Sequence, residues 1–253
     1  MRATKAMGRV GLSSHVVPPG CYAAAAFGEY HQVIEQEERA NKVVLTCASK
    51  TDVRTAPAAM TRSPRRFHLL GDSGAYTNWR RERPSKFREW FAWARDFVSM
   101  ALPLVATIAM IGLDVIPGHP QQPLTRAHIE DAAQESYANW AEANVLGLET
   151  LPTFHQGEDF KYLHQYLDAG VTYLCLSDRG SKVVSGLKEC WRHLPSGTRV
   201  HLLGATDKDV LSAVPAYSGD SSTWMQMGKN GPPKGAVCGS LGTLTWRCKA
   251  KPR

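Results

Sequence analysis

Residues 67–76 read Phe-His-Leu-Leu-Gly-Asp-Ser-Gly-Ala-Tyr, and this stretch decides how the chain is interpreted. Its first half is apolar, as in a buried strand, and it ends at Asp72, which the small residues Ser73, Gly74 and Ala75 follow. In α/β proteins the chemistry lies at the carboxyl ends of the strands. An acid there, beside small residues that let a flat ligand approach the backbone, predicts a ligand site at Asp72.

The composition is that of a globular protein with an excess of positive charge. With 253 residues and 43% hydrophobic side chains, the chain can bury a full core, and we expect a single domain over residues 1–253. The net charge of +7 favours a polyanionic partner. Within this domain, residues 1–62 are poorly assigned and residues 225–253 form a basic, glycine-rich segment.

The cysteines and the apolar runs indicate a cytoplasmic, soluble protein. None of the six cysteines forms a Cys-x-x-Cys pair, so we expect reduced thiols, no disulfide framework and no metal site. The longest apolar run, residues 101–113, is short and broken by Pro103 and Gly112, which argues against a membrane span.

Strand-like and helix-like segments alternate along most of the chain. Strands are expected at residues 43–47, 67–72, 104–113, 145–154, 171–176, 199–203 and 241–246, and helices at 29–40, 85–101, 125–140, 160–167, 184–194 and 207–214. Ser85 and Thr125 are expected N-caps, and Gly170 is expected to end a helix. Pro57 and Pro64 predict a basic surface loop over residues 49–66. The alternation predicts an α/β fold, a single (β/α)8 TIM-like barrel.

Polar residues recur where these strands end. A parallel barrel would bring Asp72, Asp114, Gln156, Ser177 and Asp220 around one mouth. An alternative is that each acid only caps the helix that follows it. Jointly that alternative is weaker, because capping accepts Ser, Thr or Asn equally well, whereas glycine and proline flank these acids as if a planar ligand must pass.

Such a set can support nucleobase chemistry without a metal or a cofactor. One carboxylate can attack the anomeric carbon of a sugar while a second carboxyl group handles the proton of the leaving group. Further acids and an amide can accept hydrogen bonds from the N–H groups at the edge of a guanine-like ring.

The motifs at these strand ends resemble those of the tRNA-guanine transglycosylases. Residues 72–76 (Asp-Ser-Gly-Ala-Tyr) resemble the family's Asp-Ser-Gly-Gly-Phe, and residues 113–117 (Leu-Asp-Val-Ile-Pro) resemble its base-reading acid with a nearby proline. Residues 155–157 (His-Gln-Gly) resemble its Gln-Gly signature, and residues 201–206 (His-Leu-Leu-Gly-Ala-Thr) resemble its turn before the nucleophilic aspartate. Residues 219–224 (Gly-Asp-Ser-Ser-Thr-Trp) are more similar to the phage branch, whose enzymes put 7-deazaguanine bases into DNA.

This resemblance, in register over residues 67–224, implies a role for each motif. Asp220 would be the nucleophile that expels guanine and forms a covalent glycosyl enzyme, and Asp72 would be the acid/base and a base contact. The binding of the incoming 7-deazaguanine would fall to Asp114, Gln156 and the adjacent Ser73, Gly74, Gly157 and Ser177. The implied activity is that of a pentosyltransferase that replaces guanine in DNA with a 7-deazaguanine precursor.

Two departures from the family pattern bear on the substrate. The C-terminal zinc subdomain of the tRNA enzymes needs a cysteine cluster and a distant histidine, whereas only Cys238 and Cys248 lie in that region and the last histidine is His201. The family's Gly-Gly-Leu loop is replaced at residues 176–180 by Leu-Ser-Asp-Arg-Gly. DNA is therefore the expected partner, with tRNA as the alternative. A hydrolytic N-glycosidase and a non-catalytic nucleic-acid-binding barrel are two further hypotheses that fit the same residues.

Basic residues follow the Asp72 strand directly. Arg80, Arg81, Arg83 and Lys86 could contact phosphates beside the site, although a solvated loop would have the same composition. Trp79 is an aromatic that could stack on an extruded base. No membrane partner is expected, and the oligomeric state is open, with a homodimer among the options.

Overall fold

The computed structural model describes residues 18–24, 41–48, 50–63, 66–83, 85–177, 183–204 and 208–221. Within these residues the strands are β1 (Gly20–Ala24), β2 (Lys42–Thr46), β3 (Phe67–Asp72), β4 (Val105–Met110), β5 (Thr153–His155), β6 (Tyr173–Ser177), β7 (Arg199–Leu203) and β8 (Ser218–Ser221). The helices are α2 (Lys50–Arg62), α3 (Ala75–Arg80), α4 (Phe87–Ala101), the 3-10 turn η2 (Leu102–Leu104), α5 (Arg126–Val145), α6 (Phe160–Asp168), α7 (Val183–His193) and α8 (Lys208–Ala213).

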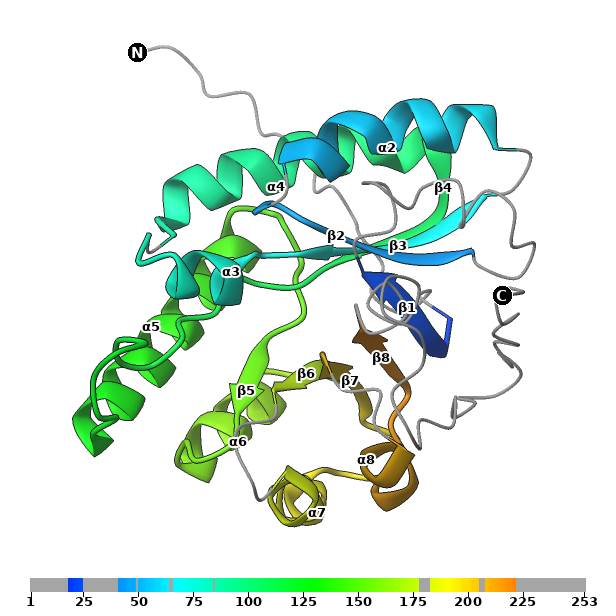
Figure 1. The fold of residues 1–253 in the computed structure, drawn as a ribbon. Helices are drawn as coiled ribbons and strands as arrows, with labels where there is room; N and C mark the ends of the chain where they lie inside the picture. Colours follow the sequence, from blue (N-terminus) through cyan, green and yellow to red (C-terminus); the bar gives the residue numbers. More distant parts are fainter. Residues whose placement is uncertain are drawn as a thin grey trace, which may run out of the picture.

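The strands form one parallel sheet in the order β4-β3-β2-β1-β8-β7-β6-β5. In Figure 1 they fall into two groups, β2 to β4 and β5 to β8, with β1 between them. Strand β1 links the groups, since it pairs with β2 at two positions and with β8 at four. Helices α2 and α4 cover the first group, and α6, α7 and α8 lie outside the second (Figure 1).

The α/β class is confirmed, but the predicted (β/α)8 TIM-like barrel is wrong. Strands β4 and β5 lie at the two edges of the sheet and do not pair as strands. The chain just beyond β4 meets the chain just before β5 at one isolated bridge, between Ile111 and Leu151. Each edge strand is paired on one side only, β4 with β3 and β5 with β6, so no closed ring of strands forms among the described residues.

Alternate residues of each strand enter different apolar clusters, as the two-residue repeat of a strand requires. In β3, Leu69 packs toward α2 and α4, whereas Leu70 lies in a third cluster with Tyr22, Ile111 and Tyr173 from other strands. A separate cluster joins the outer faces of β6 and β7 to α6, α7 and α8. Side chains of both groups of strands therefore meet in the third cluster, below the strand ends that carry the acids.

The predicted basic loop over residues 49–66 is wrong, because most of it forms α2. Ala56, Ala59 and Met60 are buried at helical spacing, and this packing outweighs the helix-breaking effect of Pro57. The Pro57 carbonyl still accepts a hydrogen bond, from Thr61 Oγ1 at 2.8 Å.

The predicted helix ends are confirmed at Thr125 and Gly170, whereas the prediction at Ser85 is wrong. Thr125 caps α5 as predicted, and Gly170 follows α6 with a φ of 86°. Ser85 is not an N-cap, because Lys86 precedes α4 and the Ser85 hydroxyl instead accepts a hydrogen bond from Asn78. The extended run predicted over 145–154 is wrong at its start, since α5 continues through Val145.

Some expectations lie outside the described residues: the helix at 29–40, the strand at 241–246, the basic segment 225–253 and the Trp224 ending. Strand β1 was not predicted, because glycine and proline at residues 18–20 obscured its short run. Within the described part of the chain, no helix is both long and apolar enough to cross a membrane.

Candidate functional site

Three acids lie at the carboxyl ends of strands from both groups. Asp72 ends β3 and pairs in register with Thr46 of β2, and Asp220 in β8 is the partner of Tyr22 in β1. Asp114 follows β4 by four residues. Asp72 and Asp114 do not cap the helices that follow them, because the N-cap residues of α3 and α5 are Gly74 and Thr125. The capping alternative is therefore wrong for Asp72 and Asp114.

Asp72 has a pKa suited to proton transfer near neutral pH. Burial raises the pKa of its carboxyl group to about 7, and repulsion from Asp220 and Asp114 acts in the same direction. Hydrogen bonds from Thr46 and from the Gly74 backbone lower the pKa in part. The repulsion indicates that the three acids share one electrostatic environment.

Asp114 belongs to a buried polar chain of four residues. Its Oδ1 accepts a hydrogen bond from Ser73 Oγ at 3.0 Å, and its Oδ2 lies 3.0 Å from Nε2 of His155. The other ring nitrogen of His155, Nδ1, lies 2.8 Å from Oε1 of Glu158. The ring of His155 is 1% exposed, so an acid on either side replaces the water it has lost.

The charge on His155 is set by these two acids. Burial lowers the pKa of the imidazole, but the hydrogen bonds to Asp114 and Glu158 outweigh burial and raise it to about 9. His155 is therefore an imidazolium at neutral pH and donates from both nitrogens.

Asp220 is held by one of its two oxygens. Its Oδ1 lies 3.1 Å from Nε2 of His201 and accepts a hydrogen bond from the backbone N–H of Gly204 at 3.0 Å. Nδ1 of His201 lies 2.8 Å from the Ser218 hydroxyl, which in turn contacts the hydroxyl of Tyr173 at 2.7 Å. Asp220 and Ser218 are two residues apart in β8, so they share the face of the strand that His201 contacts.

The turn after Asp72 needs its small residues. Gly74 has a φ of 73°, and a Cβ atom there would lie 2.9 Å from Cβ of Ala48 and 2.9 Å from Sγ of Cys47. The Cys47 thiol donates to the carbonyl of Ser73, and burial raises its pKa to about 12, so it stays protonated. Gly74 therefore lets the β3–α3 turn pack tightly against the end of β2.

Three predicted site residues are not joined to the acids by any hydrogen bond in the described part of the chain. The Gln156 side-chain amide donates to the carbonyl of Val183 at 3.0 Å, at the start of α7. Ser177 ends β6 and pairs with His155 and Leu203 in the sheet. Gly157 is exposed.

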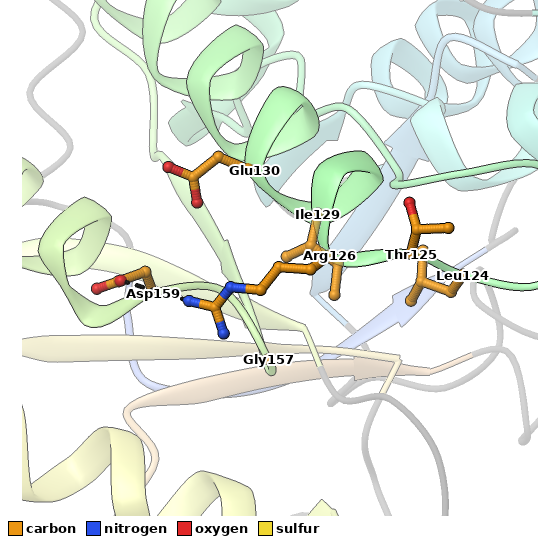
Figure 2. A pocket seen from close by; sticks show the side chains of 7 residues that line it. All are labelled: Leu124, Thr125, Arg126, Ile129, Glu130, Gly157 and Asp159. Atoms are coloured by element: carbon orange, nitrogen blue, oxygen red, sulfur yellow. Dashed lines mark ion pairs between the residues drawn. The ribbon is translucent and has the colours of Figure 1, made fainter.

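Gly157 instead lines a separate pocket of about 190 Å³ (Figure 2). The other lining residues are Leu124, Thr125, Arg126, Ile129, Glu130 and Asp159. Arg126 crosses this pocket toward Asp159, with which it makes an exposed ion pair at 3.8 Å (Figure 2). None of the three acids of the strand ends lines this pocket.

The predicted phosphate contacts lie on the surface after β3. Arg80, Arg81, Arg83 and Lys86 are all exposed, and the ion pair from Lys86 to Glu89 is a loose 3.7 Å. Within α3, Tyr76 is 58% exposed and stacks on Trp79 with ring centroids 5.9 Å apart. Trp79 donates its indole N–H to the carbonyl of Gly118 at 2.8 Å, which fixes the ring beside the β4–α5 loop.

Sequence reasoning missed the partners of the acids: His201, Ser218, Glu158 and the role of His155. Within the described residues no group of three or more His, Cys, Asp or Glu side chains is arranged to hold a metal ion. For Glu158 a signal existed, since it follows His155 by three residues directly after a strand. For His201 the signal was its polarity between the buried Val200 and Leu202.

Comparisons with known proteins bear on the fold alone. No protein-family model matches the chain. A search of curated proteins finds no match. Among solved structures, a chain of the Amycolatopsis orientalis BexX/CysO complex is similar, with a TM-score of 0.51 and 15% sequence identity. The similarity covers 83% of this chain and 82% of that one. At this identity the two chains share an α/β arrangement, and no activity follows from it.

Proposed function

We propose that this protein exchanges guanine in a polynucleotide, DNA in the first place, for a 7-deazaguanine base by double displacement at Asp220. The observation that carries the proposal is the gathering of Asp72, Asp114 and Asp220 at the strand ends, with the pKa of Asp72 raised to about 7. A site with one acid/base near neutrality and a separate carboxylate has the two groups that glycosyl transfer with retention needs.

In the first displacement Asp220 attacks C1′ of the target nucleotide. Both hydrogen bonds that Asp220 makes to described residues go to Oδ1, so Oδ2 is the attacking atom. The electron pair of the C1′–N9 bond leaves with guanine, and Asp72 in its neutral form donates a proton to the departing base. The product is an ester between Asp220 and the sugar.

In the second displacement the incoming base reverses these steps. N9 of the 7-deazaguanine gives its proton to the Asp72 carboxylate and attacks C1′, and the Asp220 carboxylate leaves. Asp72 ends protonated and Asp220 ionised, as they began, so the cycle consumes no cofactor.

Asp114 accepts hydrogen bonds from the edge of the base, beside Ser73 and Gly74. For Gln156 to take part, its amide must exchange the Val183 carbonyl for the base. Gly157 and Ser177 complete the proposed set of base contacts at the ends of β5 and β6.

The polynucleotide is the partner that the charge favours. The chain has a net charge of +7, and Arg80, Arg81, Arg83 and Lys86 are exposed on the segment that leaves the Asp72 strand. Cations in that position can neutralise the phosphates that flank an extruded nucleotide.

The test is incorporation of radiolabelled 7-deazaguanine into guanine-containing DNA and, in parallel, into tRNA by the full-length protein. Label in DNA that is lost in Asp220→Asn but kept in Asp168→Asn supports the proposal, because Asp168 is exposed at the end of α6. Label in tRNA alone, release of guanine without incorporation, or equal activity of Asp220→Asn each contradicts it.

A second measurement looks for the intermediate. Protein mixed with DNA and no incoming base should yield, after nuclease and protease digestion, a peptide carrying a deoxyribosyl group on Asp220. Absence of this adduct from a preparation that still exchanges bases would contradict the double displacement.

A further inference from the structure

Both carboxylate oxygens of Asp114 contact buried side chains. Ser73 Oγ donates to Oδ1 and His155 Nε2 approaches Oδ2, each at 3.0 Å. Glu158 holds the opposite nitrogen of His155 at 2.8 Å, and its side chain is 2% exposed. Burying a carboxylate costs free energy unless it is paired and hydrogen-bonded. The contacts from Ser73 and His155 offset this cost and hold Asp114 in one orientation, which indicates a role for the residue beyond packing.

In the contacts of His155 with Asp114 and Glu158, the histidine is the donor and both acids are acceptors. With a proton on each ring nitrogen, His155 donates to Asp114 on one side and to Glu158 on the other. Each oxygen of Asp114 then has one internal donor and a lone pair left over. Asp114 can therefore accept a hydrogen bond from a ligand but has no proton to donate to it.

The neighbouring tyrosine and cysteine side chains add no charge next to His155, Asp114 and Glu158. In the described part of the chain, titratable side chains that interact with Asp114 or Glu158 include Tyr166 of α6, Cys175 of β6, Cys190 of α7 and Asp72. Burial raises the pKa of Tyr166, Cys175 and Cys190, so all three stay neutral at physiological pH. The two acids therefore remain the partners that set the charge of His155.

We infer that His155 and Glu158 are positioning residues that keep Asp114 an ionised, acceptor-only carboxylate, so that the site takes a ring whose edge carries N–H donors, up to mildly alkaline pH. This inference rests on the proposed function, because the ring is the exchanged base. A guanine-type edge offers donors to Asp114, whereas the ring nitrogen at the same edge of adenine is an acceptor and would face a carboxylate without a proton.

Glu158 determines the pH range over which this holds. Without its charge, His155 would lose a proton at lower pH, and its neutral ring could present a lone pair on Nε2 to Asp114. Asp114 would then lose the donor to its Oδ2 and be free to turn away from the base. The fraction of protein able to bind the base would fall as the pH rises, and apparent affinity falls with that fraction.

The experiment measures binding of free guanine and free adenine to the full-length protein by calorimetry between pH 6 and 9. We expect wild type to prefer guanine with an affinity that is flat to about pH 8.5. Glu158→Gln should bind guanine like wild type at pH 6 but about tenfold more weakly at pH 8.5. The matched control is His164→Gln, which removes an exposed histidine whose partner is His193 and should leave the profile unchanged.

A titration of wild type keeps the test valid if Glu158→Gln fails to fold. In ¹⁵N-histidine spectra of the apo protein, with His155→Gln used to assign the signal, both nitrogens of His155 should stay protonated at pH 8. A neutral His155 at pH 8, or equal profiles for wild type and Glu158→Gln, overturns the inference alone. A wild type that binds no purine, while His155 stays charged, contradicts the proposed function.

Discussion

His201 and Asp220 contact each other across two neighbouring strands, with Nε2 of His201 3.1 Å from Oδ1 of Asp220. The ring of His201 is fully buried, and the side chain of Asp220 is 15% exposed. One oxygen of Asp220 is thus fixed by the protein, whereas the carboxylate as a whole still reaches solvent. For a nucleophile this contact limits rotation and points the second oxygen in one direction.

The first prediction concerns this contact. His201→Ala should lower the rate of base exchange by about 10- to 100-fold, because a hydrogen bond to a charged group is worth about 1.5–3 kcal/mol. The loss should fall on kcat more than on KM, since the base contacts remain. Steady-state incorporation kinetics measure both constants. His201→Gln, which keeps an N–H donor, should recover part of the rate, and an equal loss in both variants would contradict an orienting role.

The second prediction concerns the pH dependence of stability. The folded-state pKa of Asp72 is raised to about 7 from 3.8, so folding disfavours its ionised form. The destabilisation is nearly absent below pH 4, develops as the pH rises to 7 and is constant above that, reaching up to roughly 4 kcal/mol. Asp72→Asn should therefore unfold at higher denaturant concentration than wild type at pH 8 and at a similar concentration at pH 4.

The control for this prediction is Asp168→Asn, an exposed site in the last turn of α6. Its unfolding midpoint should change little, and equally at both pH values. If Asp72→Asn shows the same small change at pH 8 as at pH 4, the raised pKa of Asp72 is wrong. Chemical denaturation followed by tryptophan fluorescence is sufficient for all three proteins.

The sequence predicted the acids of the site because strand ends can be recognised locally. Asp72 follows an apolar run, and the rule that parallel strands end at one edge brings distant acids together without any knowledge of their contacts. The partners could not be predicted in this way. Asp114 and His155 are 41 residues apart, and their contact depends on how the β4–α5 loop returns to the end of β5.

The errors in the fold also have physical causes. The sequence shows the apolar spacing of Ala56, Ala59 and Met60, but Pro57 favours a loop when the residues are considered without their packing partners. In the folded protein, burial of this apolar face stabilises α2 despite the proline. Closure into a barrel was inferred from the alternation of strands and helices. That alternation does not show whether the two edge strands pair with each other, and in the described residues the edges meet at the isolated bridge between Ile111 and Leu151.

The third prediction concerns the turn behind Asp72. Gly74→Ala should destabilise the protein by roughly 2–4 kcal/mol, because an alanine at a φ of 73° is strained and its Cβ would crowd Ala48 and Cys47. Gly147→Ala is the matched control, since Gly147 has a φ of 87° with nothing within 4 Å of an added Cβ. It should cost only about 1–2 kcal/mol of strain. Equal losses in urea unfolding would mean that the turn is not tightly packed.

The last prediction concerns the exposed cations after β3. If Arg80, Arg81 and Arg83 contact phosphates, replacing any one by Gln should weaken DNA binding to all sequences alike and reduce the slope of log affinity against log salt by about 1. Arg192→Gln is the control, because Arg192 is exposed on α7 and paired with Glu189. Fluorescence anisotropy with a labelled duplex at several salt concentrations between about 50 and 200 mM measures the slope. Over this range, phosphate contacts change the affinity by about tenfold or more.

This measurement separates phosphate contacts from net charge. Each variant, including the control, lowers the total charge by the same amount, so a general attraction would reduce the slope equally in all four proteins. A reduction confined to the arginines at positions 80, 81 and 83 requires that the DNA backbone pass close to α3. The target nucleotide would then be held within reach of Asp72, because α3 begins three residues after that acid.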